Sequence, residues 1–226
     1  MTLSLNCSGQ NQSQELIEQT AQKVGIQNSD ILSRLATSQK FKSGTLIVIP
    51  EIAEEGDGYL ILNSNIILID DKTGTVKAKF GGEKDWYIDA VSIDEIQIEP
   101  KLYQLNDTTM AYALKINYAN QSRPNPMERI ELSLYAREGG ELKKVLKDFP
   151  IQTFEGSTNA SCTGTFEEHS KEMKVLNTHT NQYADLEFTD SIVLSETNEN
   201  CEKILEETKK EVEILKYENG EYKNVL

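Results

Sequence analysis

The chain has 226 residues and carries 37 acidic against 23 basic side chains, which gives a formal net charge of −14. This length is enough to bury a hydrophobic core without metal ions or cross-links, and the negative charge argues against nucleic acid and anionic lipid as partners. No apolar run approaches the length of a membrane-crossing helix, so we expect no transmembrane segment.

The first 13 residues are mostly small and polar, which predicts a flexible lead-in. The stretch before Cys7 lacks the basic and apolar regions of an intact signal peptide, so we expect either a cytoplasmic protein or one whose signal has been removed. Cys7 followed by small polar residues is similar to the start of a mature bacterial lipoprotein, although Asn6 departs from the small residue usual before that cysteine. Cys7 is therefore the candidate for lipid attachment, with an exposed thiol as the alternative.

Residues 14–43 predict a helical segment that packs on the rest of the protein. Apolar residues recur at helical spacing between positions 16 and 24, and Gly25 ends that run. Asn28 can cap a second short helix with an apolar face between positions 31 and 35. We expect these two helices to form a hairpin that covers one end or edge of a sheet.

From residue 44 to residue 226 the chain consists of short, β-branched segments separated by turn residues. Asn219-Gly220 is a strong signal for a two-residue hairpin turn. Residues 202–213 are ambiguous, because their many charges suit a helix, whereas the apolar spacing that follows them suits a strand. We expect a mainly β protein, in which residues 44–226 form one antiparallel sandwich or barrel-like sheet behind a short N-terminal helical hairpin.

The sequence contains no recognisable catalytic set. The two histidines, His169 and His179, match no common zinc spacing, and no nucleophile-elbow or phosphate-loop pattern is present. The acidic segment 51–58 offers oxygen ligands for calcium but lacks the spacing of an EF-hand loop. We therefore predict no metal site, no cofactor and no catalytic residue, and an enzyme with a site built from scattered residues stays the alternative.

Three residues are candidates for binding. Trp86, the only tryptophan, stands beside Tyr87 in a segment that we expect to be a loop, and Arg123 lies in a short loop stiffened by two prolines. Aromatic and arginine side chains are frequent anchors at interfaces, and a stiff loop loses little entropy on binding. We expect all three residues on one exposed side, with a lid over the core and an ordinary turn as the alternatives.

Two longer stretches carry a resemblance. The first runs from Val48 through Gly58 to the turn that ends at Gly74, and the second combines residues 122–126 with the segments 131–134 and 143–146. Together with Cys162-Thr163-Gly164 and a later cysteine, they resemble an uncharacterised group of exported proteins from Gram-negative bacteria. This group has no known activity, so the resemblance implies an exported protein but assigns no role to any residue.

The resemblance also favours a disulfide between Cys162 and Cys201. Both cysteines have polar neighbours typical of loops or strand ends, where two thiols can meet without opening the core. Cys7 is then the unpaired cysteine. The alternative is two reduced thiols in the cytoplasm, because disulfides follow the redox state of the compartment.

These observations lead to a functional hypothesis. We expect a non-catalytic exported protein, periplasmic or tethered to the outer membrane, that acts by protein or ligand binding as an inhibitor or immunity protein does. The net charge favours a basic protein partner, because opposite charges speed association. An enzyme, for example a hydrolase, and a structural envelope protein are the alternatives, and a cytoplasmic location is the alternative compartment. The oligomeric state is not predicted.

Overall fold

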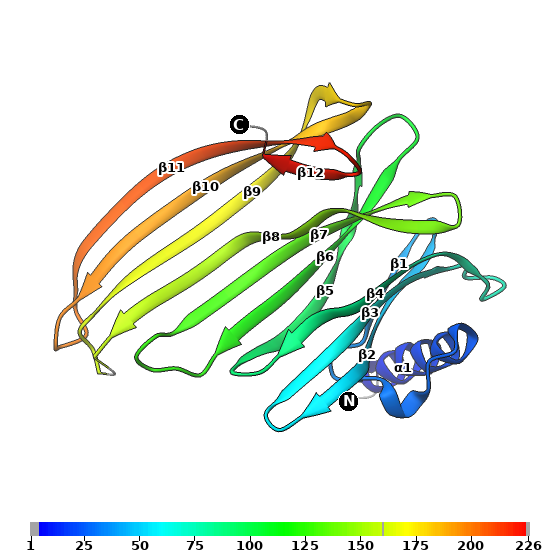
Figure 1. Cartoon of the computed structure of the whole chain (residues 1–226), viewed down its shortest axis with the longest axis horizontal. Helices are drawn as coiled ribbons and strands as arrows, with labels where there is room; N and C mark the ends of the chain where they lie inside the picture. Colours follow the sequence, from blue (N-terminus) through cyan, green and yellow to red (C-terminus); the bar gives the residue numbers. More distant parts are fainter. Residues whose placement is uncertain (1–4, 160, 225–226) are drawn as a thin grey trace. The chain divides into compact units, whose positions relative to one another are not determined.

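The computed structural model describes residues 5–159 and 161–224. This part of the chain contains one α-helix near the N-terminus and a large, mostly antiparallel sheet (Figure 1). The prediction of a mainly β, antiparallel protein with an N-terminal helical segment is confirmed. No helix among the described residues is long and apolar enough to cross a membrane.

The chain divides into two compact units, and the predicted domain from 44 to 226 is shared between them. The first unit comprises the chain up to Asp89 together with Ile96–Pro100 and Arg137–Lys143. The second comprises Ala90–Glu95, Lys101–Ala136 and the chain from Lys144 onward.

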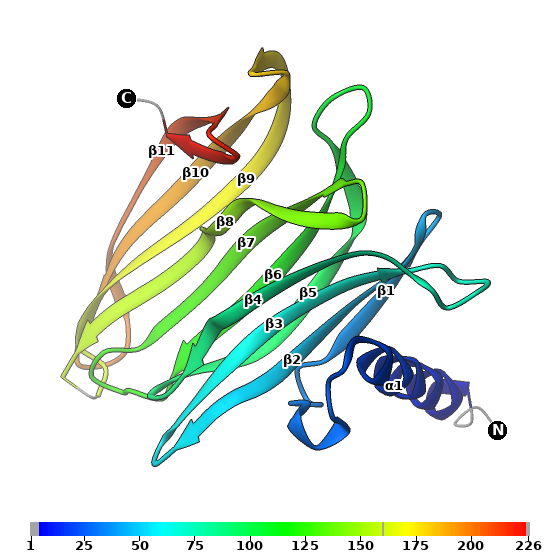
Figure 2. The same ribbon diagram turned by 45° about the vertical axis from the view of Figure 1, so that its right-hand side comes forward.

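The first unit is a helix on an antiparallel sheet in which successive strands are neighbours (Figure 2). Strand β4 also makes one parallel pairing, between Lys79 and Glu141 at the start of β8. The elements are α1 (Leu5–Val24), the 3-10 helix η1 (Asn28–Asp30), β1 (Thr37–Phe41), β2 (Gly44–Gly56), β3 (Tyr59–Ile69) and β4 (Val76–Ile88).

Helix α1 packs its apolar face on β2 and β3. Ile17 and Ala21 of the helix are buried against isoleucines that alternate along the two strands, Ile47 and Ile67 among them. Alternation places these isoleucines on one face of the sheet, because successive strand residues point to opposite faces. Helix α1 therefore covers a face of the sheet, whereas the prediction placed the helices at an end or edge, and residues 37–41 of the predicted helical segment form strand β1 instead.

The helical segment differs from the prediction at both ends. Helix α1 begins at Leu5 rather than at residue 14, so residues expected to form a flexible lead-in are helical. The expected second helix does not form beyond the three residues of η1. The reason is pairing with β2, since the Leu32 N–H donates to the Pro50 carbonyl at 2.9 Å and Ile31 bridges Glu51. A short helix cannot compete with such bonds, because helix nucleation is costly.

The second unit is an antiparallel sheet in which neighbouring strands follow one another in the chain. Its core lies under one half of the sheet and includes Leu134, Val145, Leu186, Phe188 and Leu215. The strands are β5 (Val91–Gln104), β6 (Met110–Asn120), β7 (Met127–Glu138), β8 (Glu141–Thr158), β9 (Gly164–Thr180), β10 (Tyr183–Thr197), β11 (Lys203–Glu218) and β12 (Glu221–Asn224). Residues 96–100 of β5, the end of β7 from residue 137 and the start of β8 up to residue 143 belong to the first unit.

Strands β8 to β11 continue well beyond this core. We call their outer part the extension, namely residues 152–158, 164–172, 189–197 and 203–213. Within the extension only Asp190 and Ile192 are buried. The extension is therefore a four-stranded sheet that presents most of its side chains to solvent.

A disulfide between Cys162 and Cys201 joins the outer ends of the extension. Cys162 lies in the β8–β9 connection and Cys201 in the β10–β11 connection, and their Cα atoms are 4.6 Å apart. The predicted pairing is confirmed. Cys7 lies in the first part of α1, where the side chains are outside the described part of the structure, so the prediction of lipid attachment stays a prediction.

Removing this disulfide should destabilise the second unit. The bond closes a loop with a sequence separation of 39 residues, so the double change Cys162→Ser and Cys201→Ser should lower the free energy of unfolding by about 3 to 4 kcal/mol. Denaturant unfolding measures the total change, and hydrogen exchange should show the largest loss of protection in the extension. Cys7→Ser serves as the control and should leave both measurements unchanged.

Replacing Ile17 by alanine should loosen the helix from its sheet. Because Ile17 is 2% exposed, Ile17→Ala should lower the free energy of unfolding of the first unit by about 2 to 5 kcal/mol. Gln19→Ala changes an exposed position of the same helix and should cost less than about 0.5 kcal/mol. Equal losses for the two variants in denaturant titrations would contradict the packing of α1 on the sheet.

Candidate functional site

One face of the extension gathers carboxylates around two leucines. Residues directly opposite one another in an antiparallel pair share a face of the sheet. Leu194 on β10 lies opposite Glu167 on β9 and Glu207 on β11, and Glu167 in turn lies opposite Glu155 on β8. These four side chains form one row across the sheet.

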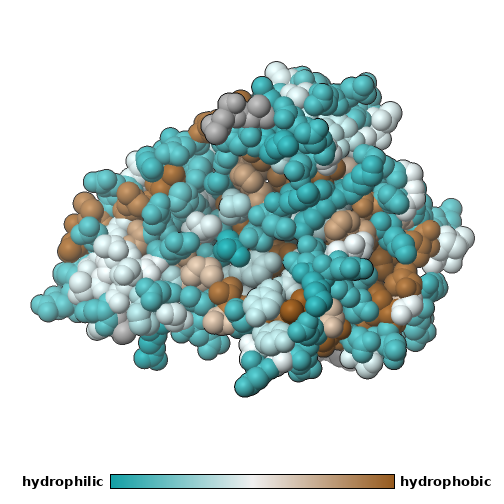
Figure 3. Space-filling model, viewed as in Figure 1, coloured by the Kyte–Doolittle hydropathy of each residue, from teal (hydrophilic) through white to brown (hydrophobic). Residues whose placement is uncertain are grey.

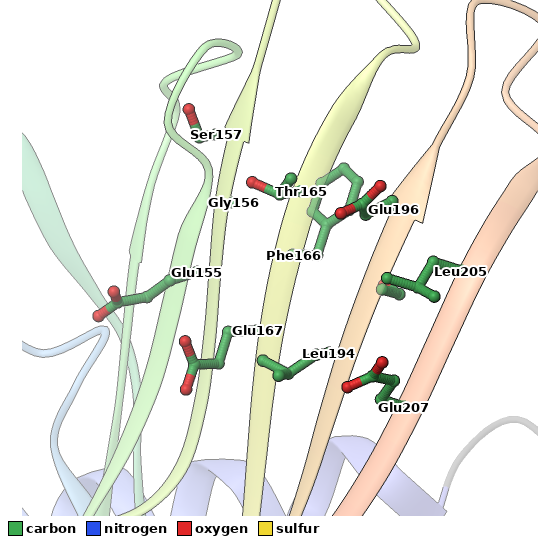
Figure 4. A pocket seen from close by; sticks show the side chains of 11 residues that line it. Glu155, Gly156, Ser157, Thr165, Phe166, Glu167, Leu194, Glu196, Leu205 and Glu207 are labelled. Carbon is green, nitrogen blue, oxygen red and sulfur yellow. The ribbon is translucent and has the colours of Figure 1, made fainter.

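A second row lies beside the first and nearer to the disulfide. It consists of Ser157, Thr165, Glu196 and Leu205 on the same four strands. Figure 4 shows the two rows side by side, with the leucines between the carboxylates. We call these two rows the acidic face.

The acidic face is hollowed into a shallow, open cavity of about 410 Å³. Among the described residues that line it there are four carboxylates and no lysine or arginine. The floor is apolar at Leu194 and at Leu205, whose side chain keeps 40% exposure. Besides the two rows, the cavity is lined by Gly156, Phe166 and Ser195.

His169 stands in the next row of the same face and holds two carboxylates. Its Nδ1 lies 2.7 Å from Asp190 Oδ2, and its Nε2 lies 3.0 Å from Glu167 Oε1. The hydrogen bond to Asp190 raises the pKa of His169, burial opposes this shift, and the hydrogen bond to Glu167 adds to it. A protonated imidazole can donate from both nitrogens at once, so His169 is suited to fix the Glu167 carboxylate at the edge of the cavity.

This arrangement differs from that of a hydrolytic triad. In a triad one ring nitrogen faces a carboxylate and the other must reach the nucleophile. Here both nitrogens of His169 face carboxylates. The geometry therefore favours a structural and electrostatic role over general-base chemistry.

The remaining candidates for metal and catalysis lie apart from this cluster. Among the described residues, no group of three or more histidine, cysteine, aspartate or glutamate side chains has an arrangement that could hold a metal ion. In the acidic segment 51–58, Glu54 accepts hydrogen bonds from Lys84 at 2.9 Å and from Tyr59 at 2.8 Å. His179 is exposed and lines a different open cavity of the second unit.

Of the three predicted binding residues, Trp86 is buried. Its side chain is only 2% exposed, so the prediction that it lies on an exposed surface is wrong. The expected loop is the end of strand β4, where Trp86 pairs with buried Leu62 and the alternation of side chains turns it inward. The same alternation turns Tyr87 outward, where it is 50% exposed and its ring stacks on that of Tyr59 at 6.0 Å.

Arg123 is exposed in its loop, and its carbonyl accepts a hydrogen bond from Thr158 at 2.9 Å. Tyr87 belongs to the first unit and Arg123 to the second, so the two residues do not share a unit. A role in binding stays a prediction for both.

The carboxylates of the acidic face were not predicted from the sequence. The sequence signal for this cluster is a glutamate that alternates with polar residues along a strand. Only the register between neighbouring strands brings these glutamates to one place. No family model, curated protein or solved structure matches this chain, so the role of the face is argued from its own geometry.

The pair between His169 and Asp190 should make stability depend on pH. Because the pKa of His169 is raised in the folded protein, its contribution is fully present below the unfolded pKa of 6.5 and is lost as the pH rises through the folded pKa. The free energy of unfolding should therefore fall as the pH rises across this interval.

Denaturant titrations at a series of pH values measure this fall. His169→Gln should remove it, because glutamine does not titrate. His179→Gln, which removes an exposed histidine outside the cluster, serves as the control. An unchanged profile in His169→Gln would assign the dependence to other groups.

Proposed function

We propose that this protein acts by binding, and that the acidic face captures a basic segment of a partner protein. The observation that carries the proposal is the cavity in which four carboxylates surround two leucines and whose described lining contains no lysine or arginine. Such a surface suits a segment that combines basic side chains with an apolar anchor. The net charge of −14 adds long-range attraction for a basic partner.

The state of the face in the free protein supports this role. The side chains of Glu155 and Glu207 are exposed, so their charges are available without prior rearrangement. The disulfide and the His169 contacts hold the strands and the Glu167 carboxylate in place. A preorganised surface loses less entropy on binding than a flexible one.

An exported location is the compartment we propose. The disulfide supports it, because such bonds persist mainly in oxidising compartments. The resemblance to exported proteins of Gram-negative bacteria points the same way, to the periplasm or to a tether on the outer membrane. In that setting an inhibitor or immunity protein against a basic toxin or enzyme fits the acidic face. We place a hydrolase second, because both nitrogens of His169 face carboxylates.

Binding to the acidic face should depend on its carboxylates. A labelled peptide of alternating arginine and leucine provides a basic probe, and fluorescence anisotropy at about 50 mM salt measures its affinity. Glu155→Gln combined with Glu196→Gln removes two charges of the cavity without touching His169 or β11. The affinity should fall by about two- to tenfold, since each rim charge contributes a fraction of a kcal/mol and steers association.

The control removes two charges from the other face of the same sheet. Glu168 and Glu172 on β9 are exposed and, by alternation, point away from the side of Glu167. Glu168→Gln combined with Glu172→Gln should therefore leave the affinity close to wild type. Equal losses for both double variants would show that only net charge matters, and an affinity indifferent to salt would reject electrostatic capture.

A further inference from the structure

Strand β11 presents a long free edge. On one side it pairs with β10 over almost its whole length, whereas on the other side β12 pairs only with Leu215–Glu218. Among the described strands, no other pairs with the edge from Lys203 to Ile214. Every second residue of this edge directs its backbone N–H and C=O away from β10, which makes it a template for another strand.

The edge also concentrates exposed apolar side chains. Four of the seven large apolar side chains that the structure describes as exposed lie on it. Ile204 and Val212 are the most exposed, at 61% each. The other two are Leu205 at 40% and Ile214 at 41%.

The sequence of the edge is self-complementary about Thr208. When two copies of β11 run antiparallel with Thr208 opposite Thr208, unlike charges and apolar side chains meet across the axis. Residues opposite one another in such a pair share a face and interact directly. The pairs are Lys209 with Glu207, Lys210 with Glu206, Val212 with Ile204 and Glu213 with Lys203, and only Glu211 with Leu205 matches neither charge nor apolarity.

Neighbouring registers are disfavoured. A twofold axis normal to the sheet keeps each residue on its own face, so the pairing can shift only in steps of two residues. Moving the axis by one residue shifts the pairing by two residues. In one direction this brings Glu207 opposite Glu207, and in the other it brings Lys209 opposite Lys209. Like charges directly opposite are destabilising, so the charges select the register centred on Thr208.

We infer that β11 pairs with β11 of a second copy of this chain and forms a symmetric dimer with a continuous sheet. Charged residues on a free edge usually prevent such pairing. Here they block the shifted registers but match the one centred on Thr208. The ion pairs of Lys209 with Glu211 at 3.0 Å and of Lys203 with Glu206 are exposed and local, so they can exchange for pairs across the axis. Glu213 already pairs with Lys171 of β9 at 2.8 Å, so Lys203 of the second copy would share this carboxylate with Lys171.

Charge reversal on the edge tests this inference with the full chain. Sedimentation velocity between about 1 and 100 μM should show a wild-type monomer–dimer equilibrium. Lys209→Glu with Lys210→Glu should abolish the dimer, and so should Glu206→Lys with Glu207→Lys. An equimolar mixture of these two double variants should form a heterodimer, and the chain with all four changes should dimerise again.

The control reverses the same number of charges away from the edge. Glu168→Lys with Glu172→Lys on β9 should leave the wild-type dimer unchanged. A wild-type chain that stays monomeric over the whole range overturns the inference. So does a dimer that persists in either β11 double variant, because its interface then lies elsewhere.

A cross-link provides a second test that does not depend on charge. In a Cys7→Ser background, Thr208→Cys places a thiol on the axis, where opposite Cα atoms lie within disulfide range. Mild oxidation should yield a covalent dimer for Thr208→Cys but not for Lys210→Cys, which lies off the axis. Equal cross-linking of the two variants would overturn the register. Because the peptide test of the acidic face changes no residue of β11, failure of one proposal is distinguishable from failure of the other.

Discussion

The cross-strand register of β8 to β11 is the constraint on which the surface of the second unit depends. A shift of one residue on any of these strands would move its side chains to the opposite face. Glu167 would then leave the acidic face, and Glu168 would replace it. The register is held at one end by the core around Phe188 and Leu215, and at the other by the disulfide between Cys162 and Cys201. Between these two ends the extension contributes little buried apolar surface.

Polar contacts take the place of a core in this middle part. Asp190 is buried, and its Oδ2 lies 2.7 Å from Nδ1 of His169. Lys171 reaches Glu213 of β11 at 2.8 Å and also lies over the ring of Phe149 at the border of the core. These contacts lie close to the core, and the carboxylates farther out, such as Glu155 and Glu207, are exposed to solvent. The extension has few buried side chains, which limits its stability, and the same exposure makes the acidic face accessible.

Much of the fold follows from local patterns in the sequence. Alternating apolar residues predicted most strands, and the Asn219-Gly220 turn joins β11 to β12 with positive φ at both residues, as a two-residue hairpin requires. The disulfide followed from polar surroundings together with the resemblance. Residues 202–213 were ambiguous because glutamate and lysine suit a helix, and only pairing with β10 decides for a strand. The segment around Trp86 was expected to be a loop, but it lacks turn residues at its centre and continues β4, so the prediction placed Trp86 wrongly.

The candidate site was harder to predict, for a physical reason. Local patterns fix which residues of one strand share a face, but they do not fix which residue of the next strand lies opposite. Glu155, Glu167 and Glu207 are far apart in the sequence, and their proximity depends on three registers, those of β8 with β9, β9 with β10 and β10 with β11. No single segment carries a signal for such a cluster. The self-complementarity of β11 is different, because it lies within one strand, but it has meaning only once that strand is known to be a free edge.

The two proposals have a common consequence for binding. In a dimer paired through β11, Lys209 of the second copy lies opposite Glu207, so the charge of Glu207 is partly neutralised at the centre of the joined sheet. The carboxylates of β8 to β10 lie farther from the axis and keep their charge. A dimer then offers two equal acidic faces on one continuous sheet. A partner with two basic segments could engage both at once, and the second contact would form at a high effective concentration. Weak electrostatic contacts on each face would in this way add up to firm capture without a deep pocket on either one.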